Sequence, residues 1–138
     1  MKLRIILAII ILGAIGVIAN YMWNKPPRNI AAAKEDFILS ASDFNKEYTI
    51  DENAANTKYL EKVIAVKGTV FEIQLENEDE PTVALATDEE GTTILCGFKK
   101  ELLPEVKKLN PGDKIKVKGK CDGKGMFGIV ITQCSLIK

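Results

Sequence analysis

The sequence predicts a mainly β domain: a closed barrel of five strands with a helix between strands three and four. A helical segment and an N-terminal apolar helix precede the barrel. Two observations carry this prediction. Beyond residue 60, apolar and polar residues alternate in five runs, as in strands with one buried face. Between the third and fourth runs, apolar residues recur at helical spacing.

The N-terminal apolar run covers residues 5–19, "IILAIIILGAIGVIA", without a charged residue. Tyr21 and Trp23 follow it, where an aromatic belt would lie at a membrane interface. The length and flanks favour a membrane anchor over residues 1–23, inserted through residues 5–23. A signal peptide cleaved before Asn20 is the main alternative, and a buried core helix is another. No cysteine directly follows the run, so we predict no lipid attachment.

The location of the domain follows from the short N-terminal tail, because such a tail usually stays in the cytoplasm. Positive charge flanks both ends of the apolar run, so the positive-inside rule does not decide the orientation. We expect a single-pass membrane protein whose domain is extracytoplasmic. Residues 24–32, which include "NKPPRN", are expected to form a stiff linker. The remaining residues, 33–138, form one domain, with the barrel over about 59–138.

The first alternating run is the longest and is expected to bend. Its apolar parity shifts after Phe71, which predicts a bulge. Strands two and three are expected over 82–88 and 92–98, strand four over 114–121 and strand five over 126–137. A second parity shift before Cys134 predicts another bulge, in strand five.

Two helical regions accompany the strands. Ser40 or Ser42 can cap a first helix, whose inward face would carry Phe44, Tyr48 and Ala55. The polar residues 51–53 interrupt it, so we expect one broken helix or two short ones. In the segment 99–110, Pro104 fits best in a first turn, so that helix is expected to begin near Leu103.

Charge is zero overall but unevenly distributed. Residues 29–98 carry five lysines against fifteen acidic residues, whereas residues 99–138 carry ten lysines against four. A dedicated nucleic-acid binder is usually strongly basic, because phosphate neutralisation supplies most of its affinity. Only the second region meets that expectation.

The basic region contains "KIKVKGKC", residues 114–121, in which every second residue is lysine. A strand would direct these lysines to one face. They either form an outward face that keeps the strand soluble or contribute to an anion site. The residues of that candidate site are Lys99, Lys100, Lys116, Lys118 and Lys120, with Lys107 and Lys108 beside them.

The sequence offers little for catalysis or metal binding. It contains no histidine, and its three cysteines, Cys96, Cys121 and Cys134, match no zinc spacing. We therefore predict no enzyme activity, no metal site and no cofactor. The cysteines are either small core residues or include one disulfide, for which Cys121–Cys134 is the preferred pair because the two residues lie in neighbouring predicted strands.

Three strands, a helix and a final hairpin are the order of an OB-fold, a five-stranded Greek-key barrel. The segments "KYLEKVIAVKGTV", "CGF", "LNPGDKIKVKGKCDG" and "CSL" also resemble the tRNA_anti-like family of OB-fold proteins. The resemblance runs from about Ala33 to Lys138. It implies kinship to anticodon-binding domains and an uncharacterised bacterial envelope protein. It brings no catalytic motif.

OB-folds bind oligonucleotides on strands two and three, usually by stacking bases on aromatic residues. We expect Phe71 and Phe127 to fill the core or a bulge here, with an outer position as the alternative. The acidic turns at 76–81 and 88–91 would repel phosphate. Two functions remain open: a module for an oligomeric anion such as nucleic acid or polysaccharide, or an envelope protein-interaction module without nucleic-acid binding.

Overall fold

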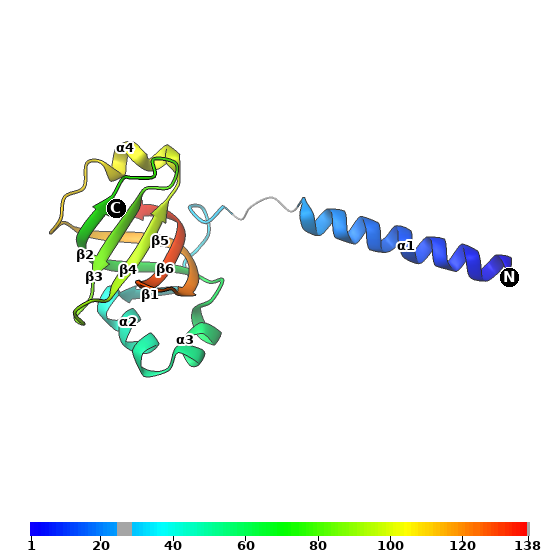
Figure 1. Ribbon diagram of the computed structural model, residues 1–138, viewed down its shortest axis with the longest axis horizontal. Helices are drawn as coiled ribbons and strands as arrows, with labels where there is room; N and C mark the ends of the chain where they lie inside the picture. Colours follow the sequence, from blue (N-terminus) through cyan, green and yellow to red (C-terminus); the bar gives the residue numbers. More distant parts are fainter. Residues whose placement is uncertain (25–28, 138) are drawn as a thin grey trace.

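The computed structural model describes residues 1–24 and 29–137, and its strands form one sheet that closes on itself (Figure 1). The strand order is β1-β2-β3-β4-β6-β5, and β2 also pairs with β5. The five strands β2 to β6 therefore form a closed barrel, which confirms the predicted fold class. The strands are β1 (Phe37–Ser40), β2 (Val63–Gln74), β3 (Thr82–Ala86), β4 (Thr93–Phe98), β5 (Lys114–Lys124) and β6 (Gly128–Ile137).

β2 closes the barrel because its two halves pair with different strands. Residues 63–69 pair with β5, and residues 70–74 pair with β3. The register with β3 slips between Val70 and Glu72, which is the predicted bulge after the parity shift. The second predicted bulge is also present, in β6. Its register with β4 and β5 shifts before Cys134, and Gln133 takes a φ of 53°.

β1 is a sixth strand that the sequence did not predict. Its four residues, "FILS", pair in parallel with β2, from Phe37 opposite Ile64 to Ser40 opposite Lys67. The segment is too short to show a period, and its partner lies more than twenty residues further along the chain. β1 extends the sheet along the first half of β2, and Phe37 and Leu39 pack against the core.

Two short helices, α2 (Ala41–Ile50) and α3 (Glu52–Tyr59), cover one end of the barrel (Figure 1). The Ser40 hydroxyl accepts a hydrogen bond from the Asp43 amide, and the Asp51 carboxylate accepts one from the Ala54 amide. These caps satisfy amides that the first turn leaves free. The predicted inward residues Phe44, Tyr48 and Ala55 are all buried.

The opposite end of the barrel carries η1 (Lys100–Leu102) and α4 (Leu103–Val106) (Figure 1). Pro104 lies in the first turn of α4, as predicted, where its missing amide hydrogen costs nothing. Val106 is buried and fastens the short helix to the barrel.

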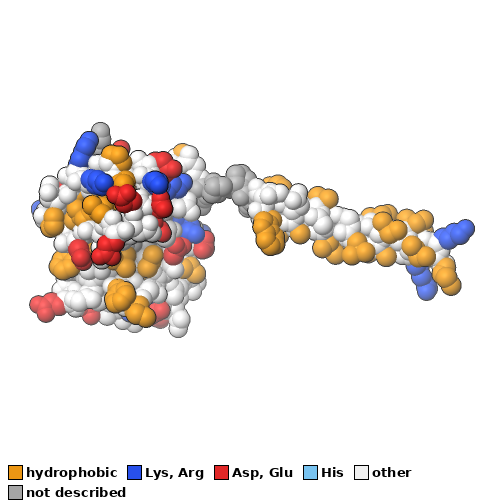
Figure 2. All heavy atoms as spheres, turned by 45° about the horizontal axis from the view of Figure 1, so that its top comes forward, with side chains coloured by type: hydrophobic (Ala, Val, Ile, Leu, Met, Phe, Trp, Pro, Cys, Tyr) orange, Lys and Arg blue, Asp and Glu red, His pale blue; other side chains and the backbone are white. Residues whose placement is uncertain are grey.

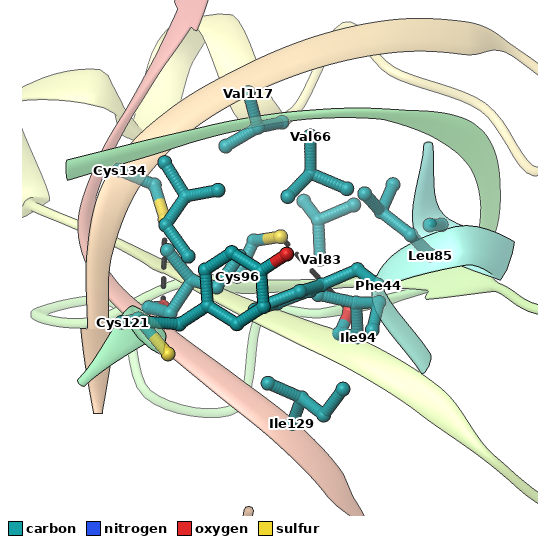
Figure 3. Close-up of a cluster of buried hydrophobic side chains, with 14 of the residues drawn as sticks. Phe44, Val66, Val83, Leu85, Ile94, Cys96, Val117, Cys121, Ile129 and Cys134 are labelled. Carbon is teal, nitrogen blue, oxygen red and sulfur yellow. Dashed lines mark hydrogen bonds between the residues drawn. The ribbon is translucent and has the colours of Figure 1, made fainter. Parts of the chain in front are cut away.

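Side chains from α2 and from all five barrel strands meet in one core (Figure 3). Val66, Val83, Leu85 and Ile94 are fully or almost fully buried there. The three cysteines are buried in the same core with free thiols.

α1 (Lys2–Trp23) is a single helix of 22 residues, none of which is buried (Figure 1). By length and composition it is apolar enough to cross a membrane. Much of the predicted linker, residues 25–28, lies outside the described residues, and the predicted domain boundaries stay predictions.

Candidate ligand-binding face

The outer face of β2, β3 and β4 contains a hollow of about 590 Å³. Phe71 and Phe127 both line it, together with small side chains such as Ala84 and Ala86 from the face itself. Strands two and three of an OB barrel, here β3 and β4, form the usual binding face of this fold. The hollow therefore occupies the position at which an OB domain holds its ligand.

Phe71 reaches this face because of the bulge in β2. Val70 pairs with Leu85 and Glu72 pairs with Ala84, so Phe71 is the residue without a partner. A bulge changes the direction of the side chain that it carries. The Phe71 side chain is 59% exposed, which contradicts the expectation that it fills the core or the bulge.

Phe127 lies in the turn between β5 and β6. The Gly125 amide donates to the Gly128 carbonyl at 2.7 Å, and the Thr93 hydroxyl of β4 donates to the Phe127 carbonyl at 3.3 Å. Only glycine fits at position 128, because a Cβ there would collide with the Thr93 backbone. The turn holds Phe127 at the rim with 72% of its surface exposed, so the core position expected for it is also wrong.

The charged residues lining this hollow are all acidic: Glu72, Asp88, Glu89 and Glu90. Of these, Asp88 lies 4.0 Å from the Lys46 ammonium. Glu72 and Glu90 form no ion pair within the described residues. The face therefore combines exposed aromatic surface with uncompensated negative charge.

The loop between β3 and β4 is held in place by α2. The Asn45 amide donates to the Glu89 carboxylate at 3.0 Å, and the Thr49 hydroxyl donates to the same oxygen at 3.1 Å. At the base of the loop, the Thr87 and Thr92 hydroxyls lie 2.7 Å apart. The rim of the hollow is thus a braced structure.

The lysines of the predicted anion site have different surroundings in the structure. Lys118 donates to the Ala33 carbonyl at 2.9 Å, and Lys120 lies 3.1 Å from Asp122 and 3.6 Å from Glu61. These contacts occupy two of the five candidate lysines.

Of the remaining candidate lysines, Lys99 and Lys100 are neighbours in the chain before α4, whereas Lys116 lies on β5. Lys100 lies 2.6 Å from Asp79. Lys99 lines a separate hollow beside Asp79 and Glu80, and Lys116 faces Lys67 across β2 and β5. An anion site that joins all five lysines stays a prediction.

The three cysteines are free thiols, and each is buried in the core. The Cys121 sulfur lies 3.4 Å from the Tyr48 hydroxyl, and the Cys134 thiol donates to the Ile131 carbonyl at 3.4 Å. Burial raises the pKa of both thiols. The Cys121–Cys134 disulfide remains a prediction. Within residues 1–24 and 29–137, no three acidic, cysteine or histidine side chains are grouped as metal ligands would be.

The closed five-stranded barrel with its terminal helices and exposed face is an OB-fold, the architecture of oligonucleotide-binding domains. The model of the tRNA_anti-like family matches residues 1–136, so the chain belongs to that family.

A crystal structure from Klebsiella pneumoniae, described as a "putative nucleic acid-binding lipoprotein", superimposes with a TM-score of 0.60 at 15% identity. The match covers 83% of this chain and 100% of that one, and it shows a shared fold.

Two further solved structures are similar over little more than half of this chain. Entamoeba histolytica asparaginyl-tRNA synthetase matches 56% of this chain and 21% of its own, with a TM-score of 0.42 at 18% identity. The Schizosaccharomyces pombe Stn1–Ten1 complex matches 55% of this chain and 58% of its own, with a TM-score of 0.40 at 14% identity. No curated protein sequence matches the chain.

Proposed function

We propose that this chain is a membrane-tethered OB-fold module of the cell envelope that binds a segment of another protein on the outer face of β2, β3 and β4. One observation carries the proposal: Phe71 and Phe127 stand exposed in one hollow whose charged lining residues are all carboxylates. Exposed aromatic side chains grouped in a hollow are typical of binding sites.

The negative charge of the face favours a cationic ligand over nucleic acid. Proteins that hold single-stranded nucleic acid combine aromatic platforms with a positively charged groove that follows the phosphates. The hollow has the platforms, and its lining, within the part of the chain that the structure describes, includes four acidic residues and no lysine or arginine. Repulsion between these carboxylates and phosphate disfavours a polyanion at this face.

A basic peptide segment satisfies both features of the hollow. Its apolar side chains would pack on Phe71 and Phe127, and its arginine or lysine side chains would pair with Glu72 and Glu90. Cations also bind over aromatic faces, and arginine does so most often. Of the two functions that the sequence left open, protein interaction is therefore the one we favour.

The tether is supported by α1. Its 22 residues exceed the roughly 20 that a bilayer core requires. In this proposal the barrel lies outside the cytoplasm. The lipoprotein description of the Klebsiella neighbour is consistent with an envelope location.

The test measures binding of four probes to the full chain in lipid nanodiscs. The probes are an arginine–leucine peptide, its glutamate–leucine counterpart, single-stranded DNA and single-stranded RNA. We expect the arginine peptide alone to bind. The double variant Phe71→Ala/Phe127→Ala should weaken it by about tenfold or more, because a cation held over an aromatic face contributes about 0.5–2 kcal/mol and the variant removes two such faces.

The matched control is Met126→Ala, because Met126 is 90% exposed beside Phe127 but does not line the hollow. It should leave peptide binding unchanged. The phenylalanine substitutions should change the free energy of unfolding by no more than about 0.5 kcal/mol, as expected for surface positions. DNA or RNA binding that disappears in the phenylalanine variant would reverse the proposal in favour of nucleic acid.

A further inference from the structure

A second hollow, of about 770 Å³, lies at the α4 end of the barrel, away from the aromatic face. Its apolar lining consists of Leu109 from the segment after α4, Ile115 from β5, and Leu136 and Ile137 from the end of β6. Three of these side chains also pack against the core, so the floor of the hollow is fixed. This end of the domain is turned toward the viewer in Figure 2, where apolar side chains lie among charged ones.

Three lysines line the same hollow: Lys67, Lys114 and Lys116. Lys67 of β2 and Lys116 of β5 are directly opposite each other in the antiparallel pair. Opposite side chains have Cβ atoms about 4.5–5.5 Å apart, and like charges at that spacing destabilise a sheet. None of the three lysines forms an ion pair or side-chain hydrogen bond within the described residues. Lys118 and Lys120, which also lie on β5, do form such contacts.

A bound anion would offset this repulsion. Among the described residues of the lining, the one acidic side chain is Glu105, which leaves a surplus of positive charge beside the apolar floor. We propose that this hollow binds a single-chain anionic amphiphile: an acyl chain that ends in a carboxylate or phosphate. The chain lies on Leu109, Ile115 and Leu136, and the anionic end lies between Lys67 and Lys116.

The dimensions and composition of the hollow support this class of ligand. Its volume falls within the range of about 300–1,000 Å³ typical of small-molecule pockets. A free phosphate or an intact bilayer headgroup would use the lysines and leave the apolar floor exposed to water. An uncharged hydrocarbon would use the floor and leave the lysine pair uncompensated. The proposal is independent of the function assigned to the aromatic face.

The test is photolabelling of the full chain in phosphatidylcholine nanodiscs with a diazirine-bearing fatty acid, at a half-saturating concentration. Labelled peptides are located by mass spectrometry. The corresponding diazirine fatty alcohol is the uncharged comparison. Labelling of residues 2–23 measures how much of each probe enters the bilayer, so hollow labelling is expressed relative to it.

We expect the acid to label the segments that contain Leu109, Ile115 and Leu136, and the alcohol to label them much less. The variant Lys67→Gln/Lys116→Gln should reduce this relative labelling by about tenfold, through loss of two charge-assisted contacts. The control Lys99→Gln/Lys124→Gln makes the same change in net charge outside the hollow and should leave the labelling unchanged.

Equal labelling of the hollow by acid and alcohol would overturn the proposal, as would labelling that survives the substitution of Lys67 and Lys116. Labelling confined to residues 2–23 would also overturn it. If replacing phosphatidylcholine by phosphatidylglycerol removes the label from the hollow, the site belongs to bilayer lipid and the single-chain ligand is wrong.

Discussion

At the scale of single residues, the buried thiols should make the stability of the fold depend on pH. Cys121 is fully buried and lies against the Tyr48 hydroxyl. Burial is the largest cause of the raised pKa of Cys121, of Cys134 and of Tyr48. An acid whose pKa is higher in the folded state keeps its proton there while the unfolded chain loses it.

This difference predicts alkaline destabilisation. Below pH 9.0, the ordinary value for a thiol, both states hold the protons and these groups leave stability unchanged. Above it, the unfolded chain ionises first, so the free energy of unfolding should fall as pH rises toward the folded-state pKa. Urea denaturation at a series of pH values measures it. Cys121→Ala should reduce the steepness of the fall; an unchanged slope would contradict the role of this thiol.

Phe71 shows which features of the site can be predicted from the sequence at this scale and which cannot. The parity shift after Phe71 predicted the bulge, but the face on which the extra side chain would lie depends on the register with β3. That register is set by the pairing of two strands, so it cannot be predicted from the sequence of one strand alone. The lysines show the same limit: their alternation was readable, whereas the contacts of Lys118 with Ala33 and Lys120 with Glu61 arise from distant segments.

At the scale of elements, α2 acts as a brace for the rim of the aromatic face. Asn45 is a buried polar side chain, and its amide donates to Glu89 in the loop between β3 and β4. A buried donor that loses its partner costs about 1–3 kcal/mol. The loop and the helix are therefore coupled through this carboxylate.

We predict that Glu89→Ala lowers the free energy of unfolding by about 1–3 kcal/mol, because Asn45 is left without its acceptor. Amide hydrogen exchange in residues 87–92 should also become faster. The control is Glu90→Ala, which removes a neighbouring carboxylate that makes no side-chain hydrogen bond within the described residues and should change neither quantity. Equal exchange rates in the two variants would show that α2 does not brace the loop.

The elements themselves were largely readable from the sequence, because the barrel strands alternate apolar and polar residues, α1 is a long apolar run, α2 begins at a serine cap and α4 has a proline in its first turn. β1 was not, since a four-residue strand has no measurable period and gains its stability from pairing with β2. The tertiary partner, and not local propensity, makes this segment a strand.

At the scale of the whole molecule, acidic and basic residues that are unevenly distributed in the sequence lie on different surfaces of the barrel. Four acidic residues line the aromatic face, and three lysines of β2 and β5 line the hollow near α4. Complementary surfaces of this kind select different ligands. One barrel therefore carries two hollows whose charged linings are of opposite sign, and the proposed tether through α1 would hold both near a membrane.

The role of α1 can be tested without disturbing the barrel, because no residue of α1 is buried. We predict that the full chain stays in the membrane fraction after an alkaline wash, and that Ile9→Arg/Leu12→Arg releases it. Each arginine at the centre of a spanning helix costs about 2.5–3.5 kcal/mol. The melting temperature of the barrel should be the same in both proteins. The control Ile9→Ala/Leu12→Ala keeps the run apolar and should stay membrane-bound. A mature protein whose measured mass lacks residues 1–19 would instead identify a cleaved signal peptide and remove the tether.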